Sequence, residues 1–247
     1  AKFEVEDTLK IKADVFGHHG MLLEGSLKVG DAVQAQVNTD LRAATVRNHS
    51  ATHLMHKALR EVLGDHVQQK GSLVNAERTR FDFAHNAPVT DEQILAIEAK
   101  VNEEIWANPA TQARVMDIES AQKTGAMMLF GEKYGETVRM VDIGGPWSRE
   151  LCAGTHVAHS SQVGLINLVS ESSVGSSNRR VEALVGADAF KSLAAERAIV
   201  HELSSSLKAP REQVTTRVAD LVASLKAAER KIAEVEAAAV REQIPAL

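Results

Sequence analysis

The sequence contains one cysteine, Cys152, among its 247 residues. A lone cysteine cannot close an intrachain disulfide, so a disulfide-held scaffold is excluded, and a reducing compartment is favoured. No stretch approaches the roughly 18 consecutive apolar residues of a membrane-spanning helix, and the N-terminus AKFEVEDTLK lacks the apolar core of a secretory signal. We therefore expect a cytoplasmic chain with no membrane partner.

Aromatic residues are also scarce, at 4%, and the net charge is −5. A negative chain cannot hold nucleic acid through an overall basic field, so any contact with nucleic acid has to be local. With 44% hydrophobic and 25% charged residues, the composition is that of an ordinary globular protein with a sizeable core.

The chain falls into three zones, which together predict an α+β fold class. Residues 1–45 hold short β-leaning segments, such as FEV and AVQAQV, between glycine and aspartate turns, and these predict part of a small β-barrel. Residues 46–186 mix helical periodicity, at 48–63 and 91–107, with β-rich segments, which predicts an α+β domain with a mainly antiparallel sheet. The β-rich segments are LVNAERTRFDF, TVRMVDI and LINLVSES.

Residues 187–247 carry no strand signal and predict a helical segment that Pro210 divides. Apolar residues in its second half follow the 4, 3, 4, 3 spacing of a heptad seam. The pattern fits a helix packed on its own chain and equally a coiled coil that forms a homodimer. The seam is Val214, Val218, Leu221, Leu225, Ala228, Ile232, Val235 and Ala239.

Two histidine-containing motifs predict a metal site. In RNHSATHLMHKALREVL, a helix would place His49 and His53 on adjacent turns of the face opposite the apolar stripe, where both can reach one divalent ion. About a hundred residues later, CAGTH holds Cys152 four residues before His156, and Gly154 between them permits a sharp turn. Three imidazoles and a thiolate suit Zn²⁺, whereas Mg²⁺ and Ca²⁺ prefer oxygen ligands. Burial of Cys152 as a small apolar residue is the alternative.

Other zinc and nucleotide chemistries lack their motifs. A zincin protease needs HExxH, but Ser50 follows the first histidine here. The H-x-E and P-C-x-x-C elements of nucleobase deaminases are absent, as are a GxxxxGK[ST] phosphate loop and a GxSxG nucleophile elbow.

Four segments, in this order and spacing, resemble the editing domain of alanyl-tRNA synthetases. They are RNHSATHLMHKAL, QQKGSLVNAERTRFDFAH, LCAGTHV and SESSVGSSNRRVEALVG. The preceding residues resemble the end of that family's β-barrel, and residues 187–247 resemble the start of its helical region. Threonyl-tRNA synthetases and free-standing deacylases share the two metal motifs, but RFDFAH and RRVEA fit the alanyl family better.

The resemblance implies a zinc-dependent deacylase that hydrolyses the ester of tRNA(Ala) mischarged with serine or glycine. A pocket sized for alanine rejects these amino acids only weakly, so a second site has to remove the errors. The family pattern gives zinc to His49, His53, Cys152 and His156. The ion would either orient the tRNA 3′ end and the amino acid or lower the pKa of a bound water, and both roles stay open.

Further roles follow from the same resemblance. Gln69 matches a pocket position of the family and is a candidate substrate contact, with Ser72 a weaker candidate. A solvated polar residue of a loop is the alternative for Gln69. Glu150 is a candidate general base or a partner of a ligand histidine, with a structural salt bridge as the alternative. The candidate tRNA phosphate contacts, each of which could instead form a surface ion pair, are Arg80, Arg179 and Arg180.

The sequence departs from the family pattern at two places. Ala153 stands where a glycine is usual, and Ser176-Ser177-Asn178 replaces a glycine before the arginines, where Asn178 could adopt a left-handed backbone. No aminoacylation core is recognisable, so we expect a fragment of a longer synthetase. A free-standing editing factor and a non-catalytic, zinc-stabilised tRNA-binding or dimerisation module are the alternatives.

Overall fold

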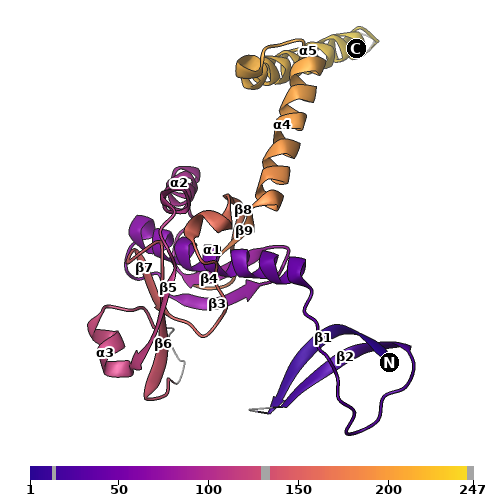
Figure 1. Ribbon diagram of the computed structural model, residues 1–247. Helices are drawn as coiled ribbons and strands as arrows, with labels where there is room; N and C mark the ends of the chain where they lie inside the picture. Colours follow the sequence, from indigo (N-terminus) through magenta and orange to yellow (C-terminus); the bar gives the residue numbers. More distant parts are fainter. Residues whose placement is uncertain (13–14, 129–133, 244–247) are drawn as a thin grey trace. The chain divides into compact units, whose positions relative to one another are not determined.

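The computed structural model describes residues 1–12, 15–128 and 134–243 (Figure 1). Glu242 and Gln243 are described by their backbone alone. The chain divides between Asn38 and Thr39 into two compact units. The three domain ranges expected from the sequence stay predictions.

The first unit is an antiparallel pair of strands. β1 (Lys2–Lys12) pairs with β2 (Val15–Glu24) over nearly its whole length. Among the described residues the pair does not close into a barrel. A strand was predicted at AVQAQV, residues 32–37. This segment has no regular structure, and it pairs with no strand in the described part of the chain.

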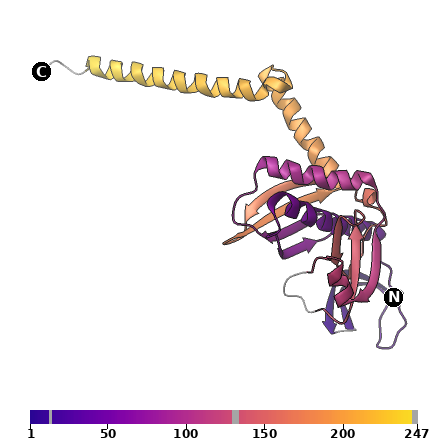
Figure 2. The same cartoon turned by 90° about the vertical axis from the view of Figure 1, so that its left-hand side faces the viewer.

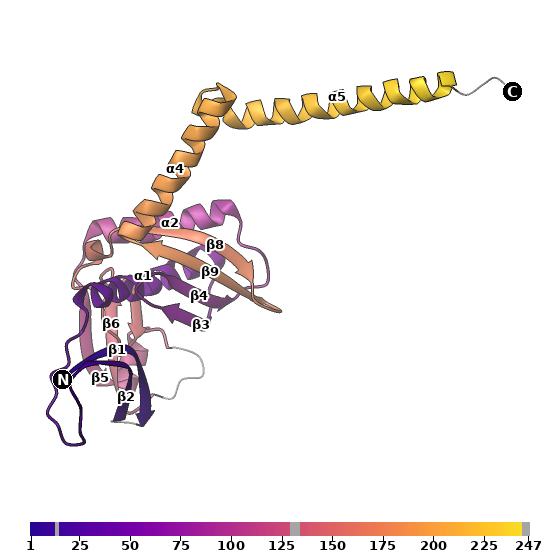
Figure 3. The same ribbon diagram turned by 90° about the vertical axis from the view of Figure 1, so that its right-hand side faces the viewer.

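Two antiparallel sheets form the centre of the second unit, which confirms the predicted α+β class (Figures 1 and 3). The four-stranded sheet has the order β3 (Gln69–Val74), β4 (Thr79–Ala84), β9 (Asn178–Val185), β8 (Ile166–Ser173). The three-stranded sheet has the order β5 (Gln112–Asp117), β6 (Thr137–Ile143), β7 (Ser148–Leu151), seen beside the short helix α3 (Ile118–Lys123) in Figure 2.

Helix α1 (Thr39–Leu63) packs against β3, β4 and β9 of the larger sheet and also contacts β6 and β7 (Figure 3). It begins well before the predicted start at Asn48. The additional turns are exposed or half-buried and carry no apolar periodicity, but Ala43 and Ala44 are strong helix formers and Asp40 suits the positive N-terminal end of a helix. The helix α2 (Asp91–Ala107) coincides with its prediction, because a Thr90–Gln93 capping box fixes its start.

The core lies between α1, α2 and the four-stranded sheet. The inward face of β4 contributes Phe81 and Phe83, both fully buried, and α1 contributes Leu54, Met55 and Leu59. Alternation along β4 is strict, since Arg80 and Asp82 point to the opposite, half-exposed face. A short 3₁₀ turn, Ser160–Val163, closes one side of this core through the buried Val163.

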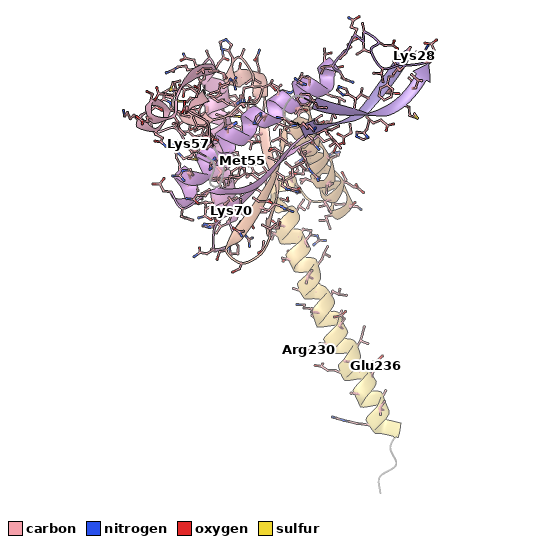
Figure 4. The ribbon with its side chains drawn as sticks, turned by 90° about the horizontal axis from the view of Figure 1, so that it is seen from below. Lys28, Met55, Lys57, Lys70, Arg230 and Glu236 are labelled. Atoms are coloured by element: carbon pink, nitrogen blue, oxygen red, sulfur yellow. The ribbon has the colours of Figure 1, made fainter. Side chains whose placement is uncertain are left out.

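The C-terminal segment is helical, as predicted. Helix α4 (Ala187–Leu207) packs on β9 and ends at Lys208 in a left-handed conformation, and a 3₁₀ turn at Arg211–Gln213, after Pro210, leads into α5 (Val214–Gln243). Figure 4 shows side chains such as Arg230 and Glu236 extending from α5. Among the helices of the described ranges, none combines the length and apolar character needed to cross a lipid bilayer.

Phe81 provides a test of this core. Replacing it by alanine leaves a cavity under α1, so we expect Phe81→Ala to lower the free energy of unfolding by about 3–5 kcal/mol. The matched control is Phe190→Ala on α4, because this residue is 62% exposed and we expect a change within about 0.5 kcal/mol. Urea denaturation followed by circular dichroism measures both, and equal effects would contradict the assigned core.

Candidate metal centre

Two separate segments bring four donor side chains to one place. His49 and His53 lie on successive turns of α1, and Cys152 and His156 lie on the loop that follows β7. One ligand atom from each of these residues lies within 4.8 Å of all the others. The predicted ligand set is therefore assembled in full, and this group could hold a metal ion.

All three imidazoles face the centre with Nε2, because their Nδ1 atoms have partners outside it. His49 Nδ1 lies 3.2 Å from the Thr155 carbonyl oxygen. His53 Nδ1 lies 2.7 Å from Glu150 Oε2. His156 Nδ1 lies 3.2 Å from Ser50 Oγ. A carbonyl and a carboxylate only accept hydrogen bonds, so His49 and His53 carry the proton on Nδ1 and keep an Nε2 lone pair for a metal.

Two of the donor–donor distances match those around a tetrahedral zinc ion. Cys152 Sγ lies 3.5 Å from His49 Nε2 and 3.4 Å from His156 Nε2. Zinc bond lengths of about 2.05 Å to nitrogen and 2.3 Å to sulfur place the two donors roughly 3.5 Å apart in a tetrahedron. His53 Nε2 is buried and has no hydrogen-bond partner. A bound cation would satisfy it.

The charges at the site also suit a divalent ion. Burial alone would raise the pKa of the Cys152 thiol, but hydrogen bonds with His156 and His49 and attraction to His53 lower it to about 3. Burial alone would likewise raise the pKa of Glu150, but attraction to His53 and hydrogen bonds with His53 and His56 hold it far below its usual range. Burial alone would lower the pKa of His53, but attraction to Glu150 raises it to about 10, so without a metal a proton on His53 offsets one of the two negative charges of the thiolate and the carboxylate. A divalent cation in place of that proton would balance both charges.

The ligand loop is fixed by a residue with no sequence signal. Arg139 on β6 donates from Nη1 to the carbonyl oxygens of Cys152 and Gly154, both at 2.8 Å. Its own carbonyl oxygen accepts from the Cys152 amide at 3.0 Å. The adjacent strand of the hairpin thereby holds the backbone of the CAGTH turn on both sides of the thiolate.

Gly154 is required for space and not for an unusual backbone angle. The loop bends sharply at this residue, as the sequence predicted, but Gly154 is absent from the positive-φ residues of the described chain. A Cβ at this position would lie 2.2 Å from His49 Cε1, and the Gly154 amide lies 3.4 Å from Cys152 Sγ, to which it donates. The loop backbone therefore lies against the His49 imidazole and donates a hydrogen bond to the Cys152 sulfur.

The histidine face of α1 is not the solvated face that its polarity suggested. His53 is 8% exposed and His56 is 2% exposed, because β7 and the loop after it cover this side of the helix. Glu150, 6% exposed, accepts hydrogen bonds from both, with Oε1 3.0 Å from His56 Nδ1. This geometry fits a partner of a ligand histidine, and it fits the structural salt bridge equally, since a protonated imidazole would make the same contacts.

The two candidate substrate contacts lie on β3. Gln69 begins the strand, is half-buried and pairs in register with Phe83, whose ring lies in the core. Ser72 is exposed and pairs with Phe81. Neither belongs to the four-donor group.

The three candidate tRNA contacts all form ion pairs within the chain. Arg179 binds Glu171 through Nε and Nη2. Arg180 binds Asp82 through the same two nitrogens, at 2.7 and 2.8 Å. Arg80 Nε lies 3.7 Å from that same Asp82. One carboxylate thus serves two guanidinium groups, and Glu182, in register with Arg80, adds a second carboxylate that pairs with Arg78.

Both departures from the family pattern are accommodated locally. Ala153 is exposed and has an ordinary backbone conformation. In the turn between β8 and β9, the left-handed residue is Ser177, with φ 59°, and not Asn178 as expected. Asn178 instead begins β9 in register with Ala84, which requires an extended backbone.

Gly154→Ala tests the close approach of the loop to His49. Because the added methyl group overlaps the imidazole, one of the two has to move, and we expect metal affinity to fall at least about tenfold with the fold retained. Gly135→Ala is the control, since its Cβ would meet nothing nearer than 3.8 Å. Zinc competition against a chromophoric chelator measures both, and unchanged affinity in Gly154→Ala would contradict the geometry.

Comparison with known proteins places this chain in a family. The family described as "Threonyl and Alanyl tRNA synthetase second additional domain" matches residues 138–182, which include Cys152 and His156. The chain is 64% identical over 236 residues to the alanine–tRNA ligase of Paracidovorax citrulli (strain AAC00-1), covering 96% of this chain and 25% of that protein.

Two further relatives give the same result. The alanine–tRNA ligase of Albidiferax ferrireducens is 64% identical over 96% of this chain and 27% of its own length. That of Herminiimonas arsenicoxydans is 63% identical over 94% of this chain and 26% of its own length. The chain thus spans about a quarter of the length of these relatives, and over that span it belongs to the alanine–tRNA ligase family.

Proposed function

We propose that this chain is the editing portion of an alanine–tRNA ligase and hydrolyses the ester of tRNA(Ala) mischarged with serine or glycine. The observation that supports this proposal most is the convergence of His49, His53, Cys152 and His156 within 4.8 Å. A free-standing editing factor with the same chemistry is the alternative arrangement. A reduced Cys152 needs a reducing compartment, so we propose that the chain acts in the cytoplasm.

Zinc is the metal that this donor set suits, and when bound it would supply a fixed positive charge and Lewis acidity. Four protein donors saturate a tetrahedral zinc ion, so we propose that the centre positions the substrate and the loop. In this proposal, Glu150 and Ser50 hold two of the imidazoles by their Nδ1 atoms. Arg139 keeps the thiolate-bearing turn in place.

Discrimination against alanine is proposed to rest on the substrate hydroxyl. A site that hydrogen-bonds the serine hydroxyl leaves its own polar groups unpaired when alanine enters, at roughly 1–3 kcal/mol per buried group. Gln69, half-buried at the start of β3, is the proposed polar contact to the substrate. Ser72 is the second candidate there.

The tRNA backbone is proposed to bind at the arginines of β4 and β9. Arg80 and Arg180 share Asp82, so a phosphate group can take over one guanidinium without leaving the carboxylate unpaired. Arg179 would have to exchange Glu171 for a phosphate. The chain has a net charge of −5, so these contacts would be local and sensitive to salt.

The first test is substrate discrimination. We expect the zinc-loaded chain to release serine from seryl-tRNA(Ala) and to leave alanyl-tRNA(Ala) largely intact, as measured by acid-precipitable counts with each labelled amino acid. Equal rates on the two substrates would contradict the proposed specificity. No hydrolysis of either, with zinc bound and the fold intact, would favour a non-catalytic tRNA-binding module.

The second test removes the thiolate. Because sulfur supplies one of four donors, we expect Cys152→Ala to bind far less zinc than the wild-type chain and to lose deacylation in parallel. Zinc content by atomic absorption after gel filtration, paired with the deacylation rate, measures this. Full zinc retention would rule out Cys152 as a ligand, and His201→Ala, an exposed histidine on α4, is the control.

A homodimer through α5 is a second candidate role. After the buried Val214, the apolar side chains of the seam are exposed, with Leu221 43%, Leu225 60% and Ile232 58% exposed. An unpaired seam of this kind is typical of one strand of a coiled coil. Sedimentation of the full chain, compared with Leu225→Glu and with the off-seam control Ala227→Glu, would distinguish a dimer from a monomer.

A further inference from the structure

His56 lies outside the four-donor group but is bound to it through one carboxylate. It follows His53 by three residues on α1 and is 2% exposed. Its Nδ1 lies 3.0 Å from Glu150 Oε1, while Oε2 of the same carboxylate lies 2.7 Å from His53 Nδ1. The buried carboxylate is thus held between a ligand histidine and a histidine that is not a ligand.

The protonation of His53, Glu150 and His56 follows from the hydrogen bonds that connect them. A carboxylate only accepts hydrogen bonds, so both imidazoles have to donate from Nδ1. His53 then presents an Nε2 lone pair to the metal centre. His56 presents its own Nε2 to the core, where that atom is buried without a partner and the ring lies 4.9 Å from the ring of Phe81.

Glu150 depends on His56 for its second hydrogen bond. The ion pairs found for this carboxylate in the described ranges are those with His53 and His56, and no lysine or arginine there lies within 4.0 Å of it. A buried carboxylate that keeps a single donor is poorly solvated and free to rotate. His56 Nε2 is buried without a hydrogen-bond partner in the described residues, which costs free energy of folding. The contact of the ring with Phe81 does not explain why the chain bears this cost.

We infer that His56 is a positioning residue, which acts through Glu150 to fix the tautomer and the orientation of the metal ligand His53. The inference rests on the proposed metal site. It predicts that the atom that matters is the Nδ1–H donor, because the other ring nitrogen has no partner. Replacing the donor should therefore disturb the metal, although His56 does not touch it.

The test compares two amide substitutions that differ only in where they place a donor. In His56→Asn the side-chain amide can take the place of Nδ1, whereas in His56→Gln it reaches the place of Nε2. Cobalt(II) chloride is titrated into the metal-free full chain, and its thiolate charge-transfer and d–d absorption bands report affinity and coordination geometry. Thermal unfolding of each metal-free variant checks the fold.

We expect His56→Gln to weaken cobalt binding by about 10–100-fold and to alter the d–d bands, while His56→Asn stays close to wild type. In a Glu150→Gln background the two substitutions should have nearly the same effect on cobalt binding, because the carboxylate that connects His56 to His53 is absent. His201→Gln, an exposed histidine on α4, is the matched control.

Equal cobalt affinities and spectra for His56→Asn and His56→Gln would overturn the inference. So would an undiminished difference between them in the Glu150→Gln background. The readout is metal binding and not hydrolysis, so the result does not depend on whether the chain deacylates tRNA.

Discussion

The constraint on which this structure depends is that three imidazoles must each turn Nε2 toward one thiolate. Each Nδ1 has its own partner: a loop carbonyl, a buried carboxylate and a helix hydroxyl. Cys152 and His49 lie 103 residues apart in sequence, so α1 and the β6–β7 hairpin have to be positioned against each other for the group to form. The fold of the second unit supplies that juxtaposition.

Local patterns allowed much of this to be predicted from the sequence. The spacing of His49 and His53 fits adjacent turns of one helix, and the spacing of Cys152 and His156 fits one short loop. The donor types pointed to zinc because thiolate and imidazole are its preferred ligands. Helix α2 forms at its predicted bounds because its hydrophobic period and the capping box at its start lie within one continuous segment.

What the sequence did not reveal depends on contacts between distant segments. The polar face of α1 was taken to point away from the core, and only β7 and its loop make it buried. Arg139 lies within an ordinary strand pattern, and nothing in that pattern indicates its hydrogen bonds to the ligand loop. Ser177, and not Asn178, adopts the left-handed conformation, because β9 pairing already fixes Asn178 as extended.

The central claim is a zinc ion held by three nitrogens and one sulfur, and X-ray absorption at the zinc edge tests it most directly. The account predicts one sulfur scatterer at about 2.3 Å and three nitrogen scatterers at about 2.0–2.1 Å. A first shell of nitrogen and oxygen alone, with no sulfur, would contradict it.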